Sequence, residues 1–231
     1  MNIITSKANN VVKKAKKLHH KKYRKDSYLI EGWHLFEEAV SSGAELIRIF
    51  ALAEYAERLA DFSQVIFVSP EILADLADSK TPQGIVAEVA FERKEIPSEL
   101  SGRYLFLEDV QDPGNVGTII RTADAAGFDG VFISSASADI YNLKTLRSMQ
   151  GSHFHLPVYR MDTADSGKPL VQRILKYGCP PGKSLLYHRI PLPEKLGQMP
   201  GPASFSIESP AGPGIISVSI GISEADDCSH F

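Results

Sequence analysis

The sequence has little of several features that mark other classes of protein. It contains two cysteines and one tryptophan in 231 residues, and two cysteines cannot form the disulfide framework of a small secreted protein. No Cys-x-x-Cys pair or Cys/His cluster is present, so we predict no structural zinc. No apolar run approaches the roughly 18 residues that a membrane-spanning helix needs, and the amino terminus lacks the charged-then-apolar layout of a secretory signal. We therefore predict a cytoplasmic protein that does not associate with a membrane.

Acidic residues are absent from the first 25 positions, which hold nine Lys or Arg residues. The whole chain carries 25 basic and 28 acidic residues, so the remaining 206 residues have a net charge of −12. A basic arm on an acidic body is typical of a tail that binds a polyanion. A solvated helix would explain the same lysines, but a cluster without acidic partners favours nucleic acid. The predicted phosphate contacts are Lys13, Lys14, Lys16, Lys17, Lys21, Lys22, Arg24 and Lys25.

The chain after the basic arm alternates between helical and strand patterns. Apolar residues at helical spacing run through 32–42, and Gly43 is a natural stop. Ser69 and Pro70 are typical of a helix start. We interpret residues 1–95 as a small α/β domain and 92–103 as a polar linker. The elements predicted in this domain are helices at 32–42, 54–61 and 69–78, and strands at 46–52, 64–68 and 85–91.

A second α/β domain is predicted over residues 100–231. Its first strand, at 104–110, leads into a loop, and a helix follows over 116–126 with Asn115 as a plausible N-cap. Alternating strands and helices predict a mostly parallel sheet, which binds ligands beyond the carboxyl ends of its strands. The other predicted elements are a helix at 139–149 and strands at 130–134, 153–159 and 215–222.

The loop before the predicted helix is the most informative stretch. Asp112 to Asn115 reads Asp-Pro-Gly-Asn, a turn sequence, and Arg121 lies on the otherwise apolar helix that follows. Such an arginine fits either a solvated charge or a guanidinium placed for a phosphate or a ribose. The loop has neither a dinucleotide-binding nor a Walker glycine pattern. Three acids, Glu108, Asp109 and Asp112, could bind magnesium, but no further motif accompanies them and we predict no metal.

The same stretch resembles motif 1 of the SpoU/TrmH group of RNA ribose 2′-O-methyltransferases, in the SPOUT class. The resemblance continues through the Arg147-Ser148-Met149-Gln150-Gly151 segment. In the front half, the segments 29–32 and 81–85 resemble the two ends of the small RNA-binding domain of that family. The motif 1 residues that match in order and spacing are Asp112, Pro113, Asn115, Gly117, Arg121, Ala123 and Gly127.

The resemblance implies an S-adenosylmethionine-dependent enzyme that methylates a ribose 2′-hydroxyl of ribosomal or transfer RNA. It implies a homodimer, an N-terminal domain similar to a ribosomal protein and a C-terminal domain with a trefoil knot. Arg121 would be the catalytic residue, and Asn115 would shape the loop and hold the arginine or the ribose. Arg147 is a candidate phosphate contact, or equally an ordinary charge on the surface of a helix. Because free arginine has a pKa above about 12, we expect Arg121 to bind the ribose and stabilise the developing alkoxide, not to act as a base.

The last third of the chain departs from the family pattern. Nine of the 14 prolines lie between Pro169 and Pro213, and no asparagine follows Asn142. The two closing motifs of the family, which build the knot and the cofactor pocket, are not readable in 166–231. We therefore carry over no cofactor-binding residue. An RNA-binding protein with a non-functional methyltransferase domain is the alternative.

Overall fold

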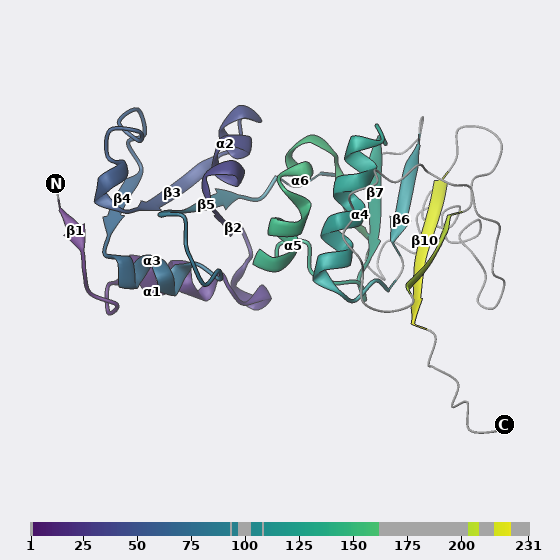
Figure 1. Cartoon of the computed structure of the whole chain (residues 1–231), viewed down its shortest axis with the longest axis horizontal. Coiled ribbons are helices and arrows are strands. Elements are labelled where there is room, and N and C mark those ends of the chain that lie inside the picture. Colours follow the sequence, from purple (N-terminus) through teal and green to yellow (C-terminus); the bar gives the residue numbers. More distant parts are fainter. Residues whose placement is uncertain are drawn as a thin grey trace, which may run out of the picture.

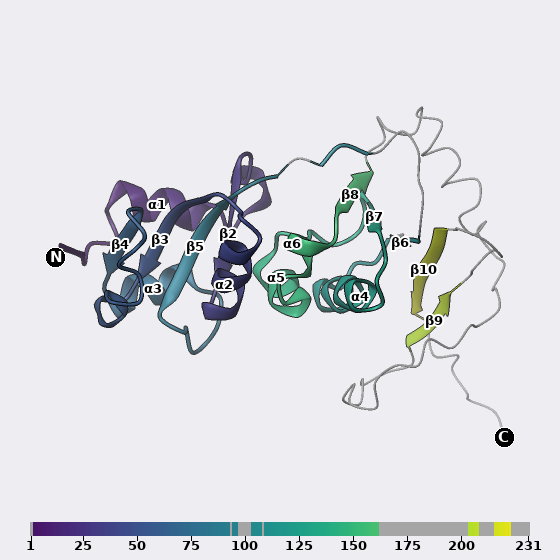
Figure 2. The same cartoon turned by 90° about the horizontal axis from the view of Figure 1, so that it is seen from above.

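The computed structural model describes residues 2–92, 94–96, 103–107, 109–161, 203–207 and 215–222. These residues form two five-stranded sheets, one built by the front half of the chain and one by the back half (Figure 1). The short helices α5 and α6 lie between the two sheets in both views (Figure 2). None of the described helices is long and apolar enough to cross a membrane.

The first sheet has the strand order β1-β4-β3-β5-β2. Strands β1, β4 and β3 are parallel, and β5 is antiparallel to both β3 and β2. Helices α1 and α3 cover one face and α2 covers the other (Figure 1), so that Ile30, Phe50 and Ile85 are fully buried. The elements are β1 (Ile3–Ile4), α1 (Asn10–Lys17), η1 (Lys21–Tyr23), β2 (Ser27–Glu31), α2 (Trp33–Ser41), β3 (Leu46–Ala51), η2 (Ala53–Tyr55), β4 (Val65–Val68), α3 (Pro70–Leu76) and β5 (Ile85–Ala90).

The predicted strands and two of the three predicted helices of this half are confirmed. The helix predicted at 54–61 is wrong: a 3₁₀ turn, η2, is followed by further turns. Leu59 in these turns is buried. Most backbone hydrogen bonds of this connection join residues three apart, as from Ala56 to Ala53, Ala60 to Glu57 and Phe62 to Leu59, which gives separate turns and no continuous α-helix.

The second sheet has the order β8-β7-β6-β10-β9, with β9 alone antiparallel to its neighbour. The predicted parallel sheet is therefore confirmed, and Ile215–Ile222 is a strand as expected. Helix α4 packs on this sheet through Val116 and Ile120, which are fully buried. The elements are β6 (Tyr104–Leu107), α4 (Pro113–Ala125), β7 (Gly130–Ser134), α5 (Leu143–Met149), α6 (Ser152–His155), β8 (Val158–Met161), β9 (Ala203–Ile207) and β10 (Ile215–Ile222).

The predicted strand at 153–159 is wrong in its first half, where α6 lies. Gln150 and Gly151 both have positive φ, 53° and 91°, which ends α5 and lets the chain begin a new short helix. The strand β8 begins only after Pro157. The predicted helix at 139–149 likewise starts later, at Leu143, because the Asn142 side chain caps it by accepting from the Lys144 amide at 2.9 Å.

Candidate active site and RNA-binding surface

The loop that precedes α4 is held by Asp112, not by Asn115. The Asp112 side chain is the N-cap and accepts a hydrogen bond from the Asn115 backbone N–H at 2.8 Å. The prediction that Asn115 caps the helix is wrong. The Lys144 ammonium of α5 lies 3.1 Å from the Asp112 carboxylate. The hydrogen bond from the Asn115 backbone N–H and the Lys144 ammonium together hold the pKa of Asp112 below its usual range. This carboxylate therefore stays charged and fixes the turn.

Gly117 lets α4 approach α5 closely, and Gly114 makes room for the side chain that caps the helix. A Cβ on Gly117 would lie 2.5 Å from the Thr145 carbonyl oxygen and 2.6 Å from the Ser148 Cβ. A Cβ on Gly114 would lie 2.9 Å from the Asp112 carboxylate. The first contact is with backbone and cannot be relieved by a side-chain movement. Gly117 is therefore required for the observed packing of the two helices.

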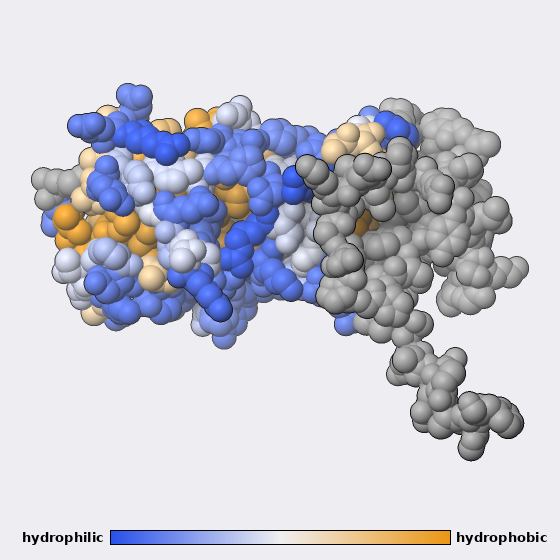
Figure 3. All heavy atoms as spheres, in the orientation of Figure 1, coloured by the Kyte–Doolittle hydropathy of each residue, from blue (hydrophilic) through white to orange (hydrophobic). Residues whose placement is uncertain are grey.

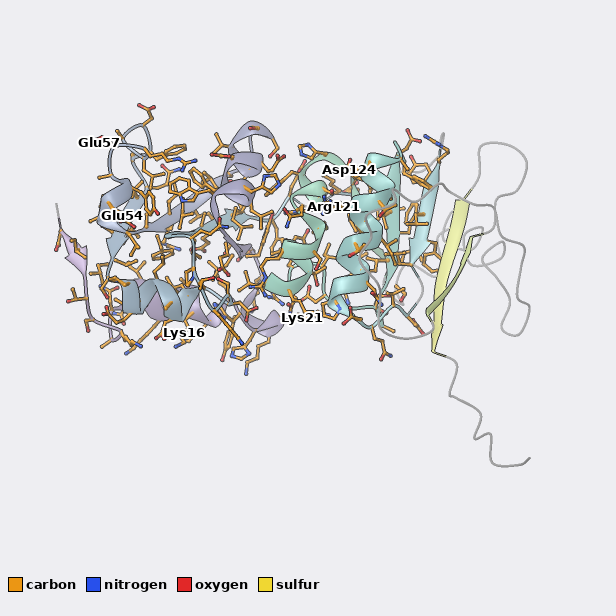
Figure 4. The ribbon with its side chains drawn as sticks, in the orientation of Figure 1. Lys16, Lys21, Glu54, Glu57, Arg121 and Asp124 are labelled. Carbon is orange, nitrogen blue, oxygen red and sulfur yellow. The ribbon has the colours of Figure 1, made fainter. Side chains whose placement is uncertain are left out.

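Arg121 lies on the same stripe of α4 as these glycines, since positions 114, 117 and 121 are spaced by three and four residues. It is exposed, and it makes no ion pair or hydrogen bond with the described residues. Figure 4 shows it on the part of α4 beside α6, with Asp124 one turn further along. The other described arginines each donate a hydrogen bond to the protein: Arg24, Arg48, Arg58, Arg103, Arg147 and Arg160. The Arg121 guanidinium is thus available to an external anion or oxygen.

The structure does not bring Asn115 and Arg121 together. They are six residues apart on one helix, which separates them by about 9 Å along the axis and by about 120° around it. Asn115 is half-buried and shapes the turn through its backbone N–H. Asn115 therefore makes no contact that would hold the arginine.

Polar groups gather at the carboxyl ends of β6 and β7. The Ser134 hydroxyl donates to the Asp109 carboxylate at 2.9 Å and also accepts from the Asp109 amide at 3.0 Å. The Ser137 hydroxyl lies 2.9 Å from that of Ser134 and accepts from the Val110 amide at 3.1 Å. Asp109 has a φ of 52°, a left-handed conformation that this network holds in place. Glu108 lies outside the described residues, among which no group of three or more potential metal ligands occurs.

The basic arm folds as α1 and η1 and exposes its lysines. Figure 4 labels Lys16 and Lys21 along this edge of the molecule, which is hydrophilic in Figure 3. Lys16 is paired with Asp75 of α3 at 3.1 Å, and Lys7 lies 3.0 Å from the same carboxylate. These two ammonium groups lower the pKa of Asp75. The lysines of the arm that make no ion pair with the described residues are Lys13, Lys14, Lys17, Lys21, Lys22 and Lys25, named here the free arm lysines.

Arg24 is not on the exposed face of the arm. Its side chain is only 5% exposed and forms an ion pair with Asp139. It also donates to the Tyr141 carbonyl at 3.0 Å and to the Leu18 carbonyl at 3.2 Å. The guanidinium predicted to contact a phosphate thus has protein partners, and it joins the front half of the chain to the back half.

Arg147 also connects the two halves. Its guanidinium lies 2.7 Å from the Asp78 carboxylate and 3.7 Å from that of Glu31. Glu31 is buried and accepts from the Asp78 amide at 2.9 Å as well. The carboxylates of Asp78 and Glu31 already neutralise the Arg147 guanidinium. In this structure Arg147 therefore has protein partners at the group that was predicted to contact a phosphate.

A cavity of about 300 Å³ lies between the two halves and was not anticipated from the sequence. The Tyr28 hydroxyl is 2.9 Å from the His153 Nε2 in its wall, and Tyr141 packs against the Tyr28 ring at 4.6 Å. Burial lowers the pKa of His153 to about 3 and raises that of Tyr141 to about 12. Both groups are therefore neutral at physiological pH.

The comparisons with known proteins agree with this geometry. Residues 102–195 match the SpoU rRNA Methylase family, and residues 9–87 match the MRM3-like substrate binding domain. The chain is 38% identical over 206 residues to the 23S rRNA (guanosine(2553)-2′-O)-methyltransferase RlmP of Bacillus subtilis, an alignment that covers 87% of this chain and 82% of that protein.

Solved structures show the same fold. The AdoMet-bound rRNA methyltransferase from Sinorhizobium meliloti is 30% identical, with a TM-score of 0.63 over 71% of this chain and 66% of that one. The SpoU methyltransferase AviRb from Streptomyces viridochromogenes, in complex with AdoMet, is 25% identical with a TM-score of 0.62 over 74% and 70% of the two chains. This chain therefore belongs to the SpoU family of rRNA methylases.

Proposed function

We propose that this protein transfers a methyl group from S-adenosylmethionine to the 2′-hydroxyl of a ribose in ribosomal RNA, and that Arg121 acts at the site of transfer. The reaction class and the cofactor follow from membership of the SpoU family and from the likeness to AdoMet-bound relatives. The observation that carries the assignment of Arg121 is its exposed guanidinium, without a partner among the described residues, on the helix face that also holds Gly117.

In this reaction the chain must hold and activate a weak nucleophile, the ribose 2′-hydroxyl. The cofactor supplies a methyl group on a sulfonium, which is already a good leaving group. The chain must then place the ribose hydroxyl in line with that methyl and stabilise the negative charge that develops on its oxygen. A guanidinium does this with fixed charge and several donors. Its pKa above about 12 makes it a poor proton acceptor, so Arg121 acts by binding and stabilising.

The packing around Arg121 suits this role. Gly117, one turn earlier on α4, seats the helix directly on the α5 backbone. The Asp112 cap and its contact with Lys144 fix the start of α4. A helix anchored at these points fixes the backbone of Arg121 before RNA arrives, so that only the side chain has to be ordered in the transition state.

The carboxyl edge of the second sheet is the part of the described structure that fits a nucleoside. Asp109, Ser134 and Ser137 place a carboxylate and hydroxyls at this edge, where α/β sheets bind ligands. Such groups are suited to the hydroxyls of a ribose. We assign no single residue to the cofactor, because the family match continues through 162–195, outside the described residues.

The substrate and the assembly are part of the proposal. The free arm lysines would bind phosphates of the RNA, and their affinity would fall as salt rises. We further propose a cytoplasmic homodimer, in which the exposed face of α4 would lie near the partner. The departure of 166–231 from the family pattern remains a prediction, since most of that segment lies outside the described residues.

A methyl-transfer assay with tritiated S-adenosylmethionine and ribosomal RNA tests the proposal. Arg121→Ala should lower the turnover at least 100-fold, in the range found when one transition-state donor is removed, with RNA affinity nearly unchanged. Arg58→Ala is the matched control, since Arg58 is an exposed arginine of the front half. Methylation by Arg121→Ala at the wild-type rate would refute the role of this residue.

Calorimetric titration of the full chain with S-adenosylmethionine separates the proposal from its alternative. An active enzyme should bind the cofactor with measurable heat. Binding of RNA together with no heat of cofactor binding at millimolar concentration would favour an RNA-binding protein whose methyltransferase half is non-functional.

A further inference from the structure

Tyr23 is an exposed aromatic ring surrounded by cations. It is 43% exposed and is one of three large hydrophobic residues that the described surface leaves exposed, with Ile3 and Val40. The Lys22 and Lys17 ammonium groups lie 4.9 and 5.6 Å from the centre of its ring. Neither Ile3 nor Val40 is aromatic or has a cation over it. Tyr23 thus combines a flat apolar surface with local positive charge.

The ring is held in this exposed position by its neighbours. Tyr23 ends the short 3₁₀ helix η1, where its backbone N–H donates to the His20 carbonyl at 3.0 Å. The next residue, Arg24, turns inward to its ion pair with Asp139. On the other side Leu18 is buried. Because both flanking contacts fix the backbone, the Tyr23 ring cannot fold into the core, and its exposure is a feature of the fold.

A basic groove leads to this ring. The groove has a volume of about 450 Å³ and runs along α1. Two of the residues that line it also touch Tyr23: His20 packs edge-on against the ring at 6.4 Å between centres, and Lys17 lies over it. The groove and the ring therefore form one continuous surface. The lining residues are Asn10, Lys13, Lys14, Lys16, Lys17 and His20.

We propose that this surface binds single-stranded RNA, with the groove contacting phosphates and Tyr23 stacking on one unpaired base. Unpaired bases stack on exposed aromatic rings, whereas bases inside a duplex are not accessible to them. A base on the Tyr23 ring would bring its flanking phosphates beside Lys17 and Lys22. The charges alone would fit any RNA, and the ring selects a strand with an unstacked base. This inference rests on the proposed action on ribosomal RNA and names the form in which that RNA is held.

Fluorescence anisotropy with the full chain tests the inference. The probes are a labelled, unstructured 12-nucleotide RNA and a duplex of the same sequence. Tyr23→Ala should weaken binding of the single strand by about 5- to 150-fold, the range for the loss of one stacked base, and should leave duplex binding nearly unchanged. Tyr23→Trp should keep the affinity, because tryptophan also stacks. Val40→Ala, at an equally exposed apolar site, is the matched control and should bind as the wild type does.

The salt dependence distinguishes stacking from charge. Tyr23→Ala removes no cation, so the slope of log affinity against log salt should stay at the wild-type value. Lys14→Gln should reduce that slope by about 0.7 for a single strand. An equal loss of duplex and single-strand binding in Tyr23→Ala, or a failure of Tyr23→Trp to bind, would overturn the stacking role.

Methyl transfer separates this inference from the proposed function. Tyr23→Ala should raise the RNA concentration needed for half-maximal rate and leave the rate at saturating RNA unchanged. If the wild-type chain methylates ribosomal RNA but Tyr23→Ala matches it in binding and in rate, the stacking site is wrong and the methyltransferase assignment stands. If the wild-type chain transfers no methyl group while Tyr23→Ala still loses single-strand affinity, the stacking site stands and the methyltransferase assignment is wrong.

Discussion

Replacing Gly117 by alanine should loosen the helix pair that carries Arg121. The added Cβ would lie 2.5 Å from the Thr145 carbonyl oxygen and 2.9 Å from the Met149 backbone nitrogen. Both atoms belong to the α5 backbone, so the two helices have to move apart. Overpacking of this kind costs about 1–3 kcal/mol, and the better helix propensity of alanine returns up to about 1 kcal/mol. We expect a net destabilisation of about 1–2 kcal/mol.

Thermal unfolding and the methylation assay measure this effect together. At this chain length the destabilisation corresponds to a fall in melting temperature of about 2–8 °C. The displacement of Arg121 should lower the methylation rate by more than the small unfolded fraction explains. Gly114→Ala is the comparison, because its closest contact is the Asp112 side chain; it should disturb the N-cap of α4 and leave the spacing of α4 and α5 unchanged. A Gly117→Ala variant as stable and active as the wild type would refute the close-packing argument.

Two other perturbations address the junction between the two halves. Arg24→Ala leaves Asp139 without its partner at a largely buried position, and should cost about 3 kcal/mol in urea unfolding; a loss below about 0.5 kcal/mol would contradict this. His153 has its pKa lowered to about 3 by burial, so its contribution to stability is present above pH 6.5 and is lost as the pH falls toward 3. His153→Gln should therefore flatten the fall in unfolding free energy between pH 6.5 and 4, while the exposed control His20→Gln should not.

The ion pairs and the hydrogen bond that join the halves bear on how the enzyme positions RNA. Arg24, Arg147 and His153 all contact residues of the opposite half. Arg147 lies in the segment that resembles the family pattern after motif 1, yet it holds Asp78 and Glu31. We therefore expect a substitution of Arg147 to change the position of the basic arm relative to the site around Arg121, and not to remove a direct contact with phosphate.

Most elements of both halves could be read from local patterns, although β1 and β2 were not predicted. A short run over 85–91 that is apolar at every position but Glu88 and a Ser-Pro start at 69–70 are signals within a few residues, and β5 and α3 follow them. The same local reading failed where two signals compete. At the start of α4 both Asp112 and Asn115 suit an N-cap, and the choice depended on backbone geometry and on Lys144 from α5.

The sequence by itself determined the family, the basic arm and the position of Arg121 on a helix, because motifs, charge runs and helical spacing are properties of neighbouring residues. Only the tertiary structure decided which cations are available to RNA. Arg24 looks like the rest of the arm in the sequence, but folding places it against Asp139, 115 residues away, while Tyr23 beside it stays at the surface. A charged side chain is neutralised by an opposite charge that the fold places within a few ångströms of it. Such a partner can lie far away in the sequence, where no local pattern identifies it.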